Sequence, residues 1–137
     1  GETPETGPQP RLADVEELLG AVRRAGLPVE LRVEGTPAEL PAAVELSAYR
    51  IIQEGLTNTL KHAEAAHADV VIRYGGDELE IAVRDDGRAG PAGDGMGHGL
   101  IGMRERVKIY GGDMSAGPAA DGGFELRARL PLRGYAA

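Results

Sequence analysis

The 137-residue sequence lacks cysteine entirely, and aromatic residues make up only 4% of it. Without cysteine, the chain can form no disulfide, no thiolate metal site and no cysteine nucleophile. Hydrophobic residues still make up 42% of the sequence, so a core is possible, but it must be built from Val, Leu, Ile and Ala. The length predicts one domain rather than two.

Two further absences limit the possible functions. No apolar run approaches the ~20 residues that a membrane-spanning helix needs, and the first residues lack the basic and apolar regions of a signal peptide. The formal net charge of -7 argues against a general nucleic-acid surface, which would need a basic patch or stripe. We therefore expect a soluble piece without a nucleic-acid partner, and composition leaves open that it is a fragment of a membrane protein.

Periodicity and turn residues divide the chain into elements. Residues 1–10 are rich in Pro and Gly and are predicted to be a linker or tail, residues 11–134 the domain, and residues 135–137 a C-terminal tail. Apolar residues at helical spacing predict three helices, at about residues 12–22, 41–63 and 100–110. Alternating apolar residues predict five strands, at about residues 29–33, 68–72, 79–83, 113–116 and 124–130.

The order of these elements indicates the fold class. The turn sequence Tyr74-Gly75-Gly76-Asp77 is a strong hairpin signal between two strands. Strands and helices alternate only in part. This pattern favours an α/β two-layer sandwich, with a mixed, mostly antiparallel sheet and helices on one face.

The first candidate site lies on the second predicted helix. Glu54, Asn58, Lys61 and His62 are three or four residues apart and therefore share one stripe. An amide oxygen is a ligand that Mg²⁺ accepts, Lys and His oppose phosphate charge, and Glu54 can orient or deprotonate a nucleophile. A solvated face with Glu–Lys pairs has the same spacing. Gly55 costs roughly 1 kcal/mol relative to Ala inside a helix, so we expect a close neighbour there.

Three glycine-containing segments follow. Asp85-Asp86-Gly87 ends a strand and offers a carboxylate beside a backbone that a ligand can approach, although Asp-Gly is also a common turn pair. The glycine-rich run from Gly95 to Gly102 leads into a helix. Such a run can bind phosphate, because free backbone N–H groups and the positive end of the helix dipole lie together there. It matches G-x-G-x-x-G, but a dinucleotide fold is rejected because no strand precedes it directly. Taken by itself, the pair Gly122-Gly123 is typical of a turn.

Together, the order and spacing of these segments resemble the ATPase domain of histidine kinases, the Bergerat fold shared with gyrase, Hsp90 and MutL. The amino-acid sequence of these motifs is most similar to that of the nitrate-sensor-like and DesK-like subfamily. The similarity lies in the runs YRIIQEGLTNTLKHA, VRDDGRAG, GHGLIGMRERV and GGFELRARLP. The resemblance covers about residues 12–132. It implies an ATP-binding catalytic domain that uses Mg²⁺.

The resemblance also implies residue roles. Asn58 matches the Mg²⁺-ligating asparagine, and Glu54 matches the acidic residue that acts as base or orients water. Asp85 matches the carboxylate that recognises the adenine amino group. The remaining positions are implied to bind the nucleotide through the phosphates, the adenine or the ATP lid: Lys61, His62, Gly87, Gly97, His98, Gly99, Leu100 and Gly123. The lid is expected at about residues 88–99.

Two departures from the family pattern stand out. Many relatives carry Thr where this chain has Gly123, so no hydroxyl is available at Gly122 or Gly123, and a water is expected to replace it. The acceptor histidine is also missing, because His62, His67 and His98 are not on a plausible dimerisation hairpin. The resemblance therefore implies an excised domain that binds ATP or ADP and autophosphorylates poorly or not at all by itself.

The implied partners are the dimerisation and His-phosphotransfer domain of the same kinase and a downstream response regulator. The domain is expected to be cytoplasmic and monomeric alone, within a dimeric full-length protein anchored in the bacterial inner membrane. One alternative is an anti-sigma-factor serine kinase of the same fold, although the run Met103-Arg104-Glu105-Arg106 is more similar to the histidine-kinase subfamily. The other alternative is a non-catalytic nucleotide-binding interaction module.

Overall fold

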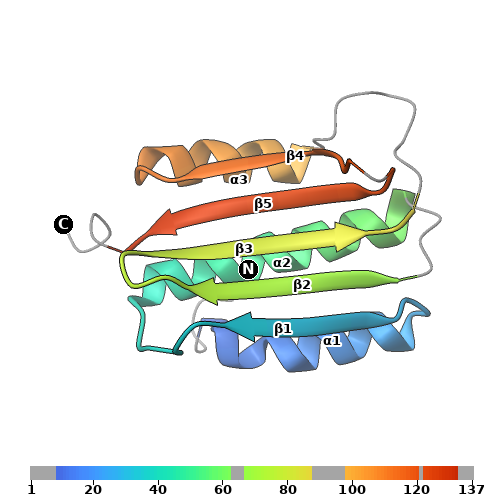
Figure 1. Cartoon of the computed structure of the whole chain (residues 1–137), viewed down its shortest axis with the longest axis horizontal. Helices are drawn as coiled ribbons and strands as arrows, with labels where there is room; N and C mark the ends of the chain where they lie inside the picture. Colours follow the sequence, from blue (N-terminus) through green and yellow to red (C-terminus); the bar gives the residue numbers. More distant parts are fainter. Residues whose placement is uncertain (1–8, 63–66, 88–97, 121, 133–137) are drawn as a thin grey trace, which may run out of the picture.

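The computed structural model describes residues 9–62, 67–87, 98–120 and 122–132. Figure 1 shows three helices behind one sheet of five strands. The helices are α1 (Val15–Arg24), α2 (Ala42–His62) and α3 (His98–Ile109), with a short 3-10 helix, η2 (Leu12–Asp14), before α1. The strands are β1 (Val29–Glu34), β2 (Ala68–Tyr74), β3 (Glu78–Asp85), β4 (Asp113–Pro118) and β5 (Phe124–Pro131).

The strand order is β1-β2-β3-β5-β4, as Figure 1 shows from bottom to top. Among the strands that the structure describes, only β1 and β2 pair in parallel, and α2 supplies the crossover that a parallel pair requires. The other three pairs are antiparallel. The turn between β2 and β3 places Gly76 at φ +85°, a conformation that glycine adopts easily. The prediction of a mixed, mostly antiparallel sheet with helices on one face is confirmed.

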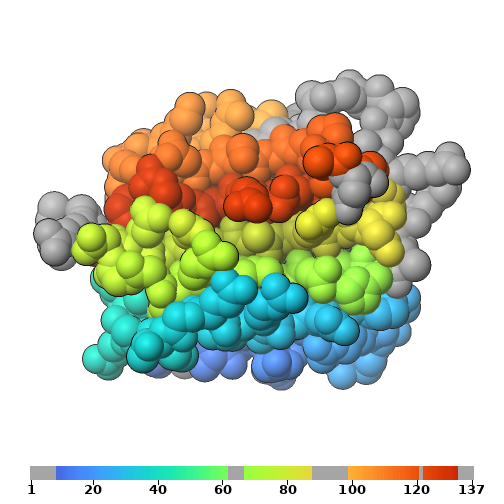
Figure 2. Space-filling view, in the orientation of Figure 1, coloured from blue at the N-terminus to red at the C-terminus, as the bar shows by residue number. Residues whose placement is uncertain are grey.

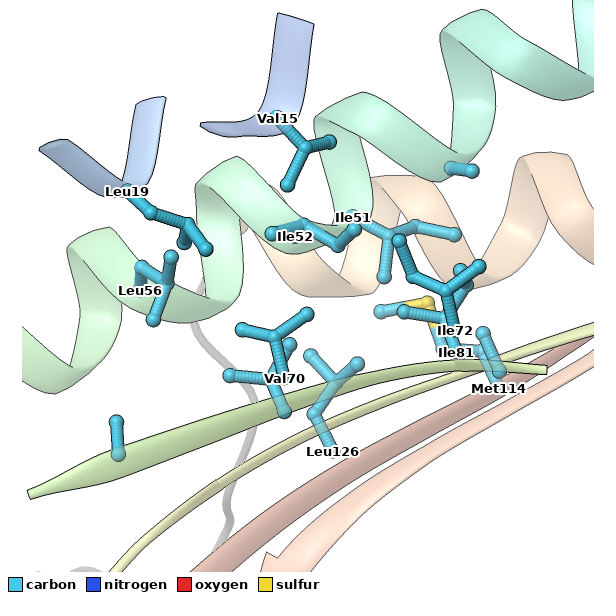
Figure 3. Close-up of a cluster of buried hydrophobic side chains, with 14 of the residues drawn as sticks. Val15, Leu19, Ile51, Ile52, Leu56, Val70, Ile72, Ile81, Met114 and Leu126 are labelled. Carbon is cyan, nitrogen blue, oxygen red and sulfur yellow. The ribbon is translucent and has the colours of Figure 1, made fainter. Parts of the chain in front are cut away.

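The core lies between the helices and the sheet. In Figure 3, Val15 and Leu19 of α1 and Ile52 of α2 point toward Val70 and Leu126 of the sheet. The largest side chains buried there are aliphatic, in agreement with the sequence prediction: Leu19, Ile51, Ile52, Leu56, Leu79, Ile81, Leu100, Leu126 and Leu130.

The opposite face of the sheet carries charged side chains and faces the viewer in Figure 2. Arg73 Nε donates to Glu34 Oε1 at 2.9 Å, and Arg73 also pairs with Glu80. The hydrogen bond and charge of Glu34 raise the pKa of Arg73 above its ordinary value. Arg129 pairs with Glu78 and Asp113. Exposed pairs of this kind contribute little to stability, and they indicate a solvated surface.

The predicted element bounds need two corrections. The first predicted helix is split, because η2 precedes α1 and the Leu12 N–H donates to Glu45 Oε1 on α2 at 2.8 Å. The third helix begins at His98 rather than at residue 100, so His98 and Gly99 belong to a helical turn and not to a loop. Within the described ranges, no helix combines the length and apolar character needed to cross a bilayer.

Candidate functional site

Four segments that are distant in the sequence meet at one end of the sandwich, on the right in Figure 1. These are the C-terminal part of α2, the end of β3, the N-terminus of α3 and the start of β5. The predicted site residues that the structure describes lie on or directly beside these segments. The tertiary structure therefore brings the separate sequence motifs to one place.

Helix α2 presents two sides at this end. Ile52, Leu56 and Thr59 are buried toward the sheet, whereas Glu54 and Asn58 are half-buried on a neighbouring side. A helical repeat of 3.6 residues produces this division, because positions four apart lie nearly above one another. Glu54 and Asn58 thus flank the core at its margin, where a polar ligand can reach them.

Gly55 allows this helix to lie close to β3. A Cβ at residue 55 would lie 3.3 Å from three side-chain atoms of Val83, which is tighter than ordinary van der Waals contact. The sequence expectation that a close neighbour needs the space at Gly55 is confirmed. The short separation brings the polar residues of α2 within reach of the end of β3.

The key residue on β3 is Asp85, a carboxylate that is only 5% exposed. Its Oδ1 accepts a hydrogen bond from the Gly87 backbone N–H at 2.9 Å. Its Oδ2 accepts one from the Thr59 hydroxyl at 3.0 Å. Burial of a carboxylate is costly unless it is hydrogen-bonded, and these two donors offset that cost. They also fix the orientation of the carboxylate plane.

The backbone around Asp85 is held from both neighbouring strands. Asp86 N–H donates to the His67 carbonyl at 3.2 Å, and His67 N–H donates to Asp86 Oδ1 at 3.0 Å. On the other side, Gly123 lies against β3, and a Cβ there would overlap the Asp85 carbonyl oxygen. The end of β3 is therefore a rigid platform for Asp85.

The N-terminus of α3 lies against Glu54. A Cβ at Gly99 would overlap the Glu54 carboxylate, so a larger residue there would have to displace that side chain. The first turn of α3 has no acidic residue of its own. A carboxylate near a helix N-terminus is favoured by the helix dipole, and here Glu54 provides that charge from a different helix.

These features match known proteins. Residues 43–134 match the family model described as histidine kinase-, DNA gyrase B- and HSP90-like ATPase. The chain belongs to this ATPase family. It is 37% identical over 110 residues to the sensor histidine kinase YxjM of Bacillus subtilis, covering 80% of this chain and 27% of that protein. It is 30% identical over 125 residues to the nitrate/nitrite sensor protein NarX of Escherichia coli, covering 89% of this chain and 20% of that protein.

Solved structures agree on the fold. The histidine kinase domain of the Erythrobacter litoralis EL346 blue-light activated histidine kinase superposes with a TM-score of 0.66 at 23% identity, covering 88% of this chain and 64% of that one. The histidine kinase AdeS of Acinetobacter baumannii gives a TM-score of 0.69 at 16% identity, with the same coverage of both chains. The chain spans about a quarter of the length of its first curated relatives. The chain thus corresponds to an ATPase-family domain similar in sequence to part of YxjM and of NarX.

Within this ATPase-family domain, the structure describes some of the predicted site residues fully and others only in part. Lys61 is exposed, and His62 is the last residue of α2, with its side chain outside the described residues, as is that of His98. Gly97 and most of the predicted lid, residues 88–97, also lie outside the described ranges.

The burial of Leu100 limits the nucleotide-binding role that the resemblance implies for it. Its side chain is 1% exposed and packs in the hydrophobic core of the ATPase fold. The side chain is therefore occupied in packing α3 against the rest of the domain. Any part that Leu100 has in nucleotide binding must come from its backbone.

The sequence motifs did not point to Thr59 as a site residue. Its hydroxyl is buried and donates toward both the Gly55 carbonyl, at 3.1 Å, and Asp85 Oδ2. The available signal was its place one residue after Asn58, which puts it on the sheet-facing side of α2. Without the position of β3, this threonine is indistinguishable from any other helical threonine.

One cluster of possible metal ligands occurs among the described residues. His67 Nε2 lies 3.7 Å from Asp69 Oδ1 and 4.0 Å from Glu30 Oε2. The three side chains are at least partly exposed at the start of β2 and on β1. Exposed acidic groups of this kind are common in proteins without a bound ion, so the cluster alone does not indicate a metal site.

Proposed function

We propose that this domain binds Mg-ATP and donates the γ-phosphoryl group to a histidine on a separate dimerisation domain of the same protein. The phosphoryl group would then pass to a response regulator. The observation that carries the proposal is the meeting of Glu54 and Asn58, Asp85-Asp86-Gly87 and the N-terminus of α3 at one end of the fold.

Each part has a chemical role in this proposal. Asp85 accepts a hydrogen bond from the exocyclic amine of adenine, and the missing side chain at Gly87 lets the ring lie close to the backbone. At the other end, Lys61, His62 and the N-terminus of α3 oppose the charge of the phosphates.

Asn58 is the proposed Mg²⁺ ligand. It is half-buried beside a carboxylate, and oxygen donors of this kind fit a hard cation that retains several waters. When bound, the ion would neutralise charge on the phosphate oxygens. Glu54 and Asn58 thus form a site of suitable chemistry on one helix.

In the transfer step, an imidazole nitrogen of the acceptor bonds to the γ-phosphorus while the bond from phosphorus to the β–γ bridging oxygen breaks, and ADP leaves. Glu54 takes up the imidazole proton or orients the ring. Catalysis is mainly positioning and charge neutralisation, as expected for phosphoryl transfer. The domain alone would bind nucleotide without phosphorylating itself appreciably. We further propose that it acts in the cytoplasm, as a monomer when isolated and within a membrane-anchored dimer when full-length.

Nucleotide titration tests the binding half of the proposal. Wild-type protein should bind ADP more tightly with Mg²⁺ than with a chelator present. Asn58→Ala should lose at least about tenfold in affinity with Mg²⁺, whereas Asn58→Asp retains an oxygen ligand and should keep the Mg²⁺ dependence. Both variants should resemble wild type in the chelator. Absence of wild-type Mg-ATP binding at millimolar concentrations would rule the proposal out.

The acceptor distinguishes the catalytic alternatives. The domain is incubated with γ-labelled ATP and either a helical hairpin carrying a phosphorylatable histidine or a serine-containing anti-sigma partner. Label on the hairpin that is lost in acid and retained in base identifies phosphohistidine. Acid-stable label on serine would instead favour the serine kinase, and nucleotide binding without transfer to either would favour an interaction module.

A further inference from the structure

Thr59 links the two halves of the proposed site. It is 5% exposed, lies one residue after Asn58 on α2, and its hydroxyl is 3.0 Å from Asp85 Oδ2 on β3. The hydroxyl has a single proton, and the Gly55 carbonyl at 3.1 Å is the competing acceptor. A carboxylate is the stronger of the two acceptors, since hydrogen bonds to ionised groups are roughly twice as strong as neutral ones.

The hydrogen bonds of Asp85 leave a defined capacity for a ligand. Gly87 N–H occupies one position on Oδ1, and the Thr59 hydroxyl occupies one on Oδ2. A carboxylate oxygen has about two acceptor positions, so each oxygen retains one. The two donors come from different elements and resist rotation of the carboxylate. A rotated carboxylate would aim its remaining lone pairs elsewhere.

On the β5 side of Asp85, the Gly122-Gly123 pair has no hydroxyl to offer. A side chain at Gly123 would overlap the Asp85 carbonyl oxygen, because β5 approaches β3 closely at this point. A threonine at residue 123 is therefore excluded by the backbone of this chain. The hydroxyl that the Gly122-Gly123 pair lacks is present on α2 instead, in the form of Thr59.

We propose that Thr59 is a positioning residue for base recognition, which holds the Asp85 carboxylate in the orientation that accepts the exocyclic amine of adenine. This inference rests on the proposed function, and it adds a residue that selects the base. A guanine presents a carbonyl oxygen in place of that amine, and the oriented carboxylate repels it. The contribution of Thr59 should therefore depend on the amine.

The test compares nucleotides with and without the amine. ADP and purine riboside diphosphate, which lacks the 6-amino group, are titrated into wild type, Thr59→Val and Thr59→Ser. Loss of a hydrogen bond to a charged group predicts roughly tenfold weaker ADP binding by Thr59→Val. Binding of the amine-free nucleotide should change by less than about twofold. Thr59→Ser keeps the hydroxyl and should retain ADP affinity.

Two further variants make the outcome decisive. Thr57→Val carries the same substitution on the same helix, away from Asp85, and should bind both nucleotides as wild type does. Thr59→Ala also removes the hydroxyl and demands less space than valine, so it replaces Thr59→Val if that variant does not fold. Equal losses for both nucleotides, or no loss for ADP, would overturn the inference while leaving ATP binding intact. Failure of wild type to bind ADP would instead remove the proposed function on which the inference rests.

Discussion

The close contact between α2 and β3 predicts opposite effects for one substitution at two helical glycines. Gly55 and Gly102 both lie inside helices, where Gly→Ala ordinarily stabilises a protein by roughly 0.5–1 kcal/mol. At Gly102 an added Cβ meets nothing within 4 Å, so Gly102→Ala should give this full gain. At Gly55 the added Cβ would lie 3.3 Å from three atoms of Val83.

The magnitude at Gly55 follows from two opposing terms. Overpacking a well-packed core costs about 1–3 kcal/mol, and the helix-propensity gain of roughly 1 kcal/mol offsets part of it. Gly55→Ala should therefore lower the free energy of unfolding by about 1 kcal/mol, which is a fall in Tm of about 4 °C for a domain of this size. The two glycine variants should thus differ from one another by about 2 kcal/mol.

A double-mutant cycle identifies the clash itself. Val83→Ala removes two of the three crowded atoms and should cost about 2 kcal/mol alone. Combined with Gly55→Ala, the cost should be about 1 kcal/mol less than the sum of the single changes, because the new methyl group enters the space that valine vacates. Urea denaturation followed by circular dichroism measures all four proteins. If Gly55→Ala stabilises the domain as much as Gly102→Ala does, the argument from close approach is refuted.

Two further predictions concern glycines at the site. Gly99→Ala should displace the Glu54 carboxylate from the N-terminus of α3. The substitution should therefore lower the rate of phosphoryl transfer to a supplied acceptor domain more than it lowers the affinity for ADP. Equal effects on the rate and on the affinity would contradict this prediction. Gly123→Ala should cost about 1–3 kcal/mol of stability through overlap with the Asp85 carbonyl and weaken ADP binding in titration. Gly117→Ala on β4, where an added Cβ meets nothing within 4 Å, is the matched control and should change neither.

Much of the fold could be predicted because its signals are local. Alternation in 29–33 and 68–72 requires only neighbouring residues, and the glycines at 75 and 76 end one strand of a hairpin before the next begins. These predictions agree with β1, β2 and the turn that follows. The start of α3 was placed two residues late, because His98 and Gly99 resemble loop residues in sequence and become helical where α3 packs beside Glu54.

The sequence by itself determined which chemistry is available at the site. A carboxylate and an amide four residues apart share a helix face by geometry, so Glu54 and Asn58 were expected together. The absence of a hydroxyl at Gly122 and Gly123 was likewise evident. Nothing in the sequence indicated where that hydroxyl is found instead.

The tertiary structure alone decided how the motifs contact one another. Thr59 and Asp85 are 26 residues apart, and their hydrogen bond exists because α2 crosses β3 at the distance that Gly55 permits. Leu100 is implied by the resemblance to bind the nucleotide, yet its side chain is in the core. Local sequence patterns carry information over one or two helical turns. Contacts such as these depend instead on the packing distance between a helix and a sheet. Many side-chain volumes along both elements together set that distance.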